Sequence, residues 1–304
     1  MRIPILFFLS FVVSLTGKVC TKQCSNSVGE KNIAPQALFI VISSCIACIF
    51  FFISGGFHIA VNLETLMFAC LFAMVCSVSV LTSLVAYRLA TIAGVNIIAG
   101  ACSTVCSTLI GSVIFHEILD GRRIFRLLLL ICACVLVALN VLQKEKAKEE
   151  ATGKIRKRQS GRFAVVLVLF VLVGCSNTFL SKAFVQSETV TDENSYFFVT
   201  NLIMVLVGAA VFGIRAITNR QEAKEAVYLL QPKQLLTISV STITSNLTSL
   251  IGIWLMAMVD IAVYSPVSQA LGVLSAVAAS WLFREKQGVL LWAAAALACI
   301  SVIL

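Results

Sequence analysis

Charged residues are scarce in this chain. Asp, Glu, Lys and Arg make up 12% of its 304 residues and hydrophobic residues 60%, whereas charged residues make up about 25% of ordinary soluble domains. This shortage excludes a typical soluble protein. Because a helix needs roughly 20 apolar residues to cross a membrane, the sequence predicts an all-α polytopic membrane protein.

The residue groupings that carry out catalysis are also missing. The sequence shows no nucleophile grouped with a base and an orienting residue, no phosphate-binding loop and no cluster of metal ligands. We therefore expect no enzyme, no cofactor and no metal site. Cys45-x-x-Cys48 matches a redox or metal pair in spacing only, and the twelve cysteines, which lie in or beside apolar runs, favour a role in helix packing.

Acidic side chains are missing from the middle of every predicted helix. Glu64, Glu117, Asp260 and Glu285 all lie at helix ends. A proton-coupled carrier generally needs a titratable group at membrane depth, so the sequence names no coupling residue.

Long apolar runs fill most of the chain and predict about ten membrane-spanning helices. They are expected over residues 3–23, 35–55, 65–88, 92–115, 122–142, 163–185, 195–216, 235–258, 260–283 and 287–304. We expect the first run to be a retained helix rather than a secretory signal. A short surface helix is expected in the connection over residues 218–234.

The chain repeats part of itself. When the sequence is aligned with itself so that Val95 meets Val263, the segment Val95–Glu117 lies on Val263–Glu285, with Val, Ser, Phe and Glu residues identical at six places. A second alignment, in which Arg2 meets Arg162, also lays Lys22 on Lys182. Internal repeats of this kind are typical of secondary transporters. We therefore predict two inverted five-helix repeats, over residues 1–142 and 162–304, joined by a charged linker over residues 143–161.

Positive charge is concentrated on one predicted side of the membrane. The net charge is +9, and eight of the 23 Lys and Arg residues lie between Lys144 and Arg162. Loops and helix ends on the linker side hold 18 of these residues and the opposite side holds five. Basic loops face the cytoplasm, so this distribution predicts a cytoplasmic linker and outward-facing termini, and it argues against a nucleic-acid partner.

Three features resemble the ten-helix, EamA-type branch of the drug/metabolite transporter superfamily. They are the two five-helix halves, the helix endings AYRLA (86–90) and IWLMA (253–257), and a Glu followed by a Gly that opens the next helix in FHEILDG (115–121) and FREKQG (283–288). The resemblance covers essentially the whole chain. It implies an inverted repeat, a central cavity and alternating access, and it also implies cytoplasmic termini, which the charge distribution contradicts.

Polar residues recur on one face of the two matched helices and form the predicted substrate-binding site. Asn96, Gly100, Ser103 and Ser107 share one face of the helix over 92–115. The alignment of Val95 with Val263 carries this face to Tyr264, Ser268, Leu271 and Ser275 of the helix over 260–283. Such a stripe either packs helices through small residues or lines a cavity, and both alternatives stay open. The predicted substrate-binding residues are Asn96, Ser103, Ser107, Asn246, Tyr264, Ser268, Gln269 and Ser275.

Lys22 and Lys182 form a matched pair near helix ends. A lysine there either extends its ammonium to the membrane interface or attracts a carboxylate or phosphate at the rim of a cavity. We include both residues as candidate substrate-attracting groups.

The function predicted from these features is secondary transport. We expect the protein to move a small polar or amphipathic metabolite across the cytoplasmic membrane, as a multi-pass protein that is a monomer or homodimer in the lipid bilayer. A flippase-like carrier of lipid-linked substrates and a non-transporting membrane sensor or interaction subunit are the alternatives.

Overall fold

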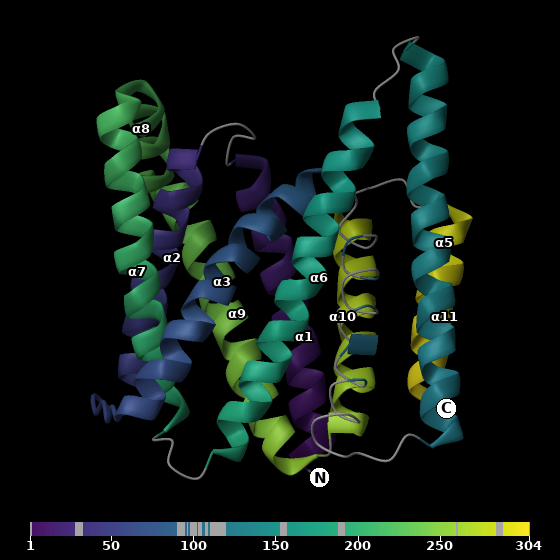
Figure 1. Cartoon of the computed structure of the whole chain (residues 1–304), viewed down its shortest axis with the longest axis horizontal. Coiled ribbons are helices and arrows are strands. Elements are labelled where there is room, and N and C mark those ends of the chain that lie inside the picture. The colour runs from purple at the N-terminus through teal and green to yellow at the C-terminus, as the bar shows by residue number, and fades with distance from the viewer. Residues whose placement is uncertain are drawn as a thin grey trace. The chain divides into compact units, whose positions relative to one another are not determined.

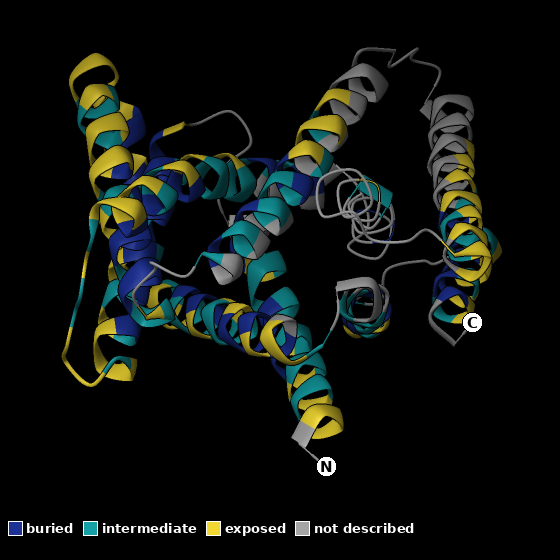
Figure 2. Cartoon of the chain, turned by 60° about the horizontal axis from the view of Figure 1, so that its bottom comes forward, coloured by how far each residue is buried: buried dark blue, intermediate teal, exposed yellow. Residues whose placement is uncertain are grey.

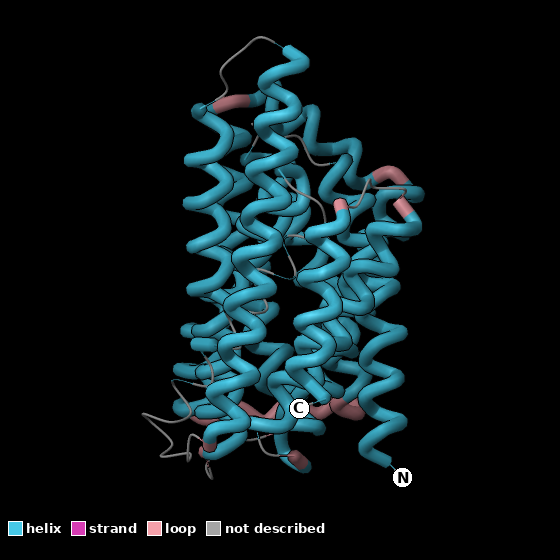
Figure 3. The backbone as a smooth tube through the Cα atoms, turned by 90° about the vertical axis from the view of Figure 1, so that its right-hand side faces the viewer, coloured by secondary structure: helices cyan, strands magenta, loops and turns pink. Residues whose placement is uncertain are grey.

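All the regular secondary structure in the described part of the chain is helical. The computed structural model describes residues 2–27, 33–89, 95, 97, 102, 105, 106, 109, 120–152, 157–187, 192–259, 261–283 and 288–303. No strand occurs within these ranges (Figure 3). The all-α class predicted from composition is confirmed for them.

Eleven helical elements follow one another in the described ranges, and Figure 1 labels most of them. They are α1 (Arg2–Ser27), α2 (Ile33–Ser54), α3 (Leu63–Leu89), α5 (Gly121–Thr152), α6 (Lys157–Gln186), α7 (Glu193–Thr218), α8 (Arg220–Ala226), the 3-10 helix η1 (Val227–Leu230), α9 (Pro232–Met258), α10 (Ile261–Leu282) and α11 (Val289–Ile303).

Nine of the predicted helices coincide with these elements, and α8 matches the predicted short helix. The tenth, over 92–115, lies almost wholly outside the described residues. Two predicted ends differ from the structure by more than four residues: α5 continues beyond 142 to Thr152, and α6 begins before 163, at Lys157. The sequence KEKAKEEA within α5 consists of residues with high helix propensity, which explains why the helix continues past its apolar part.

Five of the described helices are long and apolar enough to cross a membrane. Their spans are Ile3–Cys24, Ile33–Ser54, Leu63–Thr82, Glu193–Thr218 and Pro232–Leu255. Shorter apolar stretches lie in α5, α6, α10 and α11. In Figure 2 the long helices carry exposed residues on one side and buried residues on another. This pattern fits helices that meet lipid on one side and protein on the other.

The contacts within the chain define two compact units. Unit 1 comprises Met1–Leu15, Ala86–Phe179 and Leu255–Leu304, and unit 2 comprises Thr16–Val85 and Leu180–Trp254. Each unit contains segments from both predicted repeats. The borders of the compact units therefore differ from the predicted borders of the repeats.

Unit 2 is built around the antiparallel pair α2 and α7, which lie side by side in Figure 1. Gly208 of α7 lies against Ala37 and Val41 near the start of α2. At the other end of the pair, the ring of Phe197 stacks on Phe51 with centroids 4.9 Å apart. The pair thus keeps one register along most of its length.

Polar groups at helix starts fix the ends of this pair. Asp192 accepts hydrogen bonds from the backbone N–H and the hydroxyl of Ser195, at 2.7 and 2.8 Å, and so caps α7. The same hydroxyl accepts a hydrogen bond from the N–H of Ala60 at 3.0 Å. Glu222 of α8 is buried and accepts a hydrogen bond from the N–H of Ala34 at 2.9 Å, which satisfies a free donor at the start of α2.

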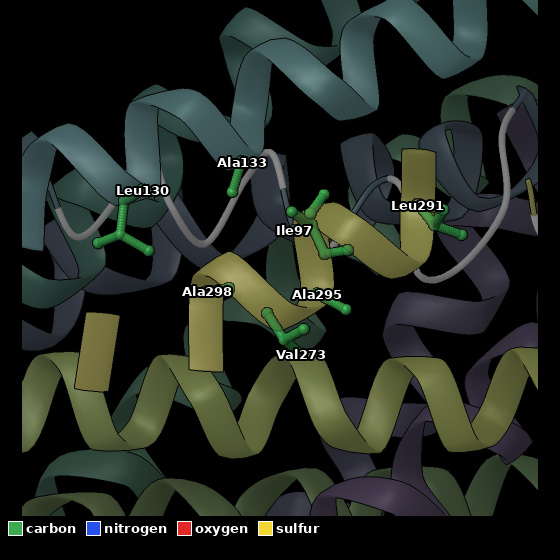
Figure 4. Close-up of a cluster of buried hydrophobic side chains, with 8 residues drawn as sticks. Ile97, Leu130, Ala133, Val273, Leu291, Ala295 and Ala298 are labelled. Carbon is green, nitrogen blue, oxygen red and sulfur yellow. The ribbon is translucent and has the colours of Figure 1, made fainter. Parts of the chain in front are cut away.

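Unit 1 contains a core of small and branched apolar side chains from α5, α10 and α11. Figure 4 shows that α11 contributes Leu291, Ala295 and Ala298 to this core, facing Leu130 of α5 and Val273 of α10. The alanines allow the α11 backbone to approach its neighbours closely, as is usual between membrane helices. Helices α5 and α11 are accordingly in extensive contact (Figure 1).

Candidate functional site

Hydroxyl side chains line the contact between the second half of α1 and α9 in unit 2. The hydroxyls of Thr21 and Ser241 lie 2.8 Å apart. One turn earlier in α1, Gly17 is so close to α9 that an added Cβ would lie 3.1 Å from the Thr244 hydroxyl oxygen. We call Gly17, Thr21, Ser241 and Thr244 the α1–α9 seam. The two helices run antiparallel along it.

Two lysines flank this seam on α1. Lys18 follows Gly17, and Lys22 follows Thr21 one turn later, so both ammonium groups project from one flank of the helix. Both side chains are half-buried. Lys18 lies within the membrane span Ile3–Cys24, more than two turns before the end of α1 at Ser27. Ionisable side chains inside a membrane span are costly and usually mark a functional site.

The sequence prediction counted Lys18 with the loop and helix-end residues that set topology, whereas the structure places it within the span Ile3–Cys24. The signal was present, because the predicted helix over 3–23 already enclosed this residue.

Most of the other polar side chains of α9 are satisfied within their own helix. Thr248 and Ser249 donate to the carbonyls one turn earlier, at 2.8 and 3.1 Å. The predicted binding residue Asn246 donates from its amide nitrogen to the carbonyl of Thr242 at 2.9 Å. Its side-chain amide oxygen is an acceptor that this bond does not use. Asn246 lies in the same unit as Lys18 and Lys22.

The predicted residues of α10 belong to unit 1. The ring of Tyr264 stacks on Phe7 of α1 with centroids 6.4 Å apart. A hydrogen bond joins the side chains of Tyr264 and Ser268, which are one turn apart. Both residues are partly exposed. This end of the stripe therefore combines an aromatic face with two hydroxyls.

Ser275, at the other end of the α10 stripe, has different surroundings. It is fully buried, and its hydroxyl oxygen lies 3.3 Å from that of Ser14 in α1. It also donates to the carbonyl of Gly272 at 2.9 Å. These contacts are those of a residue that packs two helices together.

Several predicted site residues have no described surroundings. Asn96, Ser103 and Ser107 lie outside the described residues, and the side chains of Gln269 and Lys182 are not described within their helices. Their binding roles stay predictions, as do those of Asn246, Tyr264 and Ser268.

The arrangement in unit 2 is suited to a polar ligand. The hydroxyls along the α1–α9 seam bond to one another and to carbonyls of their own helices, and the two ammonium groups beside them, one turn apart, create a positive potential. Charged-group hydrogen bonds are stronger than neutral ones. A carboxylate or phosphate is therefore the ligand group that this flank of α1 would favour.

Comparison with known proteins identifies the fold without naming a function. No family model and no curated protein matches the chain. Sixteen chains of solved structures do match. One of them, described only as a crystal structure of a protein, aligns over 98% of this chain and 95% of its own length, with 15% sequence identity and a TM-score of 0.50. At this identity the match shows a shared fold alone.

Proposed function

We propose that this protein is a secondary transporter that moves a small polar or amphipathic metabolite across the cytoplasmic membrane by alternating access. The observation that carries the proposal is the position of Lys18, beside a hydroxyl-lined helix contact and inside a membrane span. Ionisable side chains within a membrane span usually mark a substrate or ion pathway, and a carrier can use an ammonium group at this position to bind its cargo.

The packing of corresponding helices supports the same proposal. Under the predicted duplication α2 corresponds to α7, and α5 corresponds to α11. Each of these two pairs is in extensive contact. A pseudo-two-fold axis in an inverted repeat brings corresponding helices together in this way. The sequence resemblance to EamA-type drug/metabolite transporters agrees with this arrangement.

Substrate flux through the purified protein tests the proposal. A panel of metabolites is first screened for thermal stabilisation of the protein, because any ligand of the native state raises its stability. The stabilising compounds are then measured for flux into sealed proteoliposomes. We expect at least one of them to be transported, with a carboxylate or phosphate among its groups.

Removal of the Lys18 charge should lower this flux. Loss of one charged hydrogen bond costs roughly 1.5–3 kcal/mol, so Lys18→Gln should reduce flux about tenfold or more. Lys233→Gln is the matched control, because Lys233 is exposed in the first turn of α9 and its loss should leave flux nearly unchanged.

The other outcomes separate the alternatives. Stabilisation without flux would favour a non-transporting sensor. Competition by lipid-linked compounds alone would favour a flippase-like carrier. Normal flux in both Lys18→Gln and Lys22→Gln would show that the α1–α9 seam is not part of the substrate pathway. The proposal that the protein is a transporter would still stand.

A further inference from the structure

The connection between α7 and α9 lies at a surface of the membrane. The span Glu193–Thr218 ends immediately before it, and the span Pro232–Leu255 begins immediately after it. Two consecutive spans leave the chain between them at the same membrane surface. This connection consists of Asn219, α8, η1 and Gln231, and we call it the surface segment. Figure 1 shows α8 at one end of the α2–α7 pair, in contact with both helices.

The surface segment is held firmly against unit 2. Glu222 is buried, and one of its carboxylate oxygens accepts the hydrogen bond from the N–H of Ala34. Its other carboxylate oxygen accepts one from the side-chain amide of Asn219 at 3.3 Å. Leu229 of η1 is buried in a cluster that includes Phe39 of α2. These contacts fix which side of the segment faces outward.

The outward side of the surface segment carries two positive charges. Arg220, Lys224 and Val227 follow one another at spacings of four and three residues, so they share one face of the continuous helix formed by α8 and η1. All three side chains are exposed, whereas Glu222 and Ala226, on the other face, are buried. The segment is therefore amphipathic in an unusual sense, with its basic groups beside an exposed apolar side chain.

Large apolar side chains extend this exposed surface. Val227 and Leu230 of η1 are 52% and 51% exposed, and Ile217, in the last turn of α7, is 87% exposed. Contact of such side chains with water is unfavourable. A helix at the boundary between lipid headgroups and acyl chains can place its apolar side chains among the chains and its basic side chains among the headgroups. The surface segment carries both kinds of side chain.

The two ends of the α2–α7 pair differ in charge. The surface segment and the first turn of α9 have one exposed acidic side chain, Glu225, and three exposed basic side chains, Arg220, Lys224 and Lys233. At the other end of the pair, acidic side chains lie at the starts of α3 and α7, namely Glu64, Asp192 and Glu193. Attraction of negative charge is therefore a property of the end that holds the surface segment.

We propose that the surface segment is a binding site for anionic phospholipids, with Arg220 and Lys224 at the headgroups and Val227 and Leu230 among the acyl chains. Basic residues at a membrane surface attract anionic lipids, and the apolar side chains add the contact with lipid that a soluble anion cannot provide. Because the segment is fixed to α2 through Glu222 and Leu229, bound lipid holds this end of unit 2 at the level of the headgroups.

Tryptophan quenching by brominated lipids tests this site. Full-length protein with Leu230→Trp is reconstituted into vesicles of phosphatidylglycerol and phosphatidylcholine, in which one or the other lipid carries brominated acyl chains. The signal of the three native tryptophans is measured in the unmodified protein and subtracted. We expect quenching by both lipids, with a preference for phosphatidylglycerol of about threefold or more, because each nearby basic residue can change a binding constant by about fivefold.

Removal of the two outward charges should abolish the preference. In the Leu230→Trp protein, Arg220→Gln together with Lys224→Gln should bring the two lipids close to equal quenching and leave the reporter in contact with lipid. Arg122→Gln is the matched control, because Arg122 is an exposed basic residue in the first turn of α5. Its loss removes the same charge elsewhere and should leave the preference unchanged.

Three results would overturn the proposal. Equal quenching by the two lipids before any charge is removed would show that the segment does not select anionic lipid. No quenching by either lipid would show that water, a second copy of the chain or another protein covers Leu230. A similar loss of preference in Arg122→Gln would show an effect of net charge instead of a local site. Val227→Trp provides a second reporter if Leu230→Trp fails to fold.

Discussion

Two serines of the single helix α10 have different surroundings. Ser275 is fully buried against Ser14 of α1 and is hydrogen-bonded within its own helix. Ser268 is partly exposed and shares a hydrogen bond with Tyr264. The alternatives of packing and lining, left open for the stripe as a whole, can therefore be tested residue by residue.

Leucine substitutions separate these roles. Ser275→Leu places a large side chain in a close contact between helices, and overpacking of this kind costs about 1–3 kcal/mol or more. We expect it to lower the melting midpoint strongly. If Ser268 lines the substrate path, as predicted, Ser268→Leu should leave the midpoint nearly unchanged and block flux, because the larger side chain would occupy space that the substrate needs. Parallel melting and flux assays measure both effects, and equal loss of stability in the two variants would identify the whole stripe as packing.

At the scale of the element, the contact between α2 and α7 depends on one glycine. A Cβ added at Gly208 would lie 3.0 Å from Val41 Cγ2 and 3.2 Å from Ile40 Cγ2, whereas one added at Gly213 would meet nothing within 4 Å. Both glycines lie in α7. The same change at the two positions therefore has opposite consequences.

Alanine at these two glycines should shift stability in opposite directions. Gly208→Ala should lower the free energy of unfolding by about 1–3 kcal/mol, because α2 must move away or repack. Gly213→Ala should raise it by up to about 1 kcal/mol, since alanine is the better helix former. Thermal melting of both variants in the same detergent gives the comparison. A stabilised Gly208→Ala would show that the two helices are less closely packed than described.

The sequence was informative about helices and less so about their partners. Apolar runs located nine helices, because the length and composition of a membrane span are local properties. The pairing of α2 with α7 depends on side-chain fit between segments that are far apart in the chain, which no local pattern encodes. For the site, Lys22 and Asn246 were named from the sequence. The α1–α9 seam was not, because which side chains of two distant helices meet depends on their three-dimensional packing.

At the scale of the whole molecule, the distribution of Lys and Arg makes a prediction about orientation. The eight basic residues between Lys144 and Arg162 should face the cytoplasm if basic segments control insertion. The family resemblance implies the opposite orientation. Thr152, the last residue of α5, is a suitable reporter position.

Labelling of Thr152→Cys from outside intact cells distinguishes the two orientations. We expect no reaction with a membrane-impermeant thiol reagent until the cells are opened, because the charge distribution predicts a cytoplasmic segment. The native cysteines provide the background signal, which is measured in the unmodified protein. Strong labelling of Thr152→Cys in intact cells would show that the termini are cytoplasmic and that the charge distribution was misleading.

The lengths of α5 and α6 limit how far any transport cycle can open. The charged linker was expected over 143–161, yet α5 ends at Thr152 and α6 begins at Lys157. Five peptide steps join these two residues, and a fully extended chain covers roughly 3.3–3.6 Å per step. The end of the first predicted repeat and the start of the second are therefore joined by a tether of at most about 18 Å. Any relative motion of the two predicted repeats must therefore keep these two helix ends within that distance of each other.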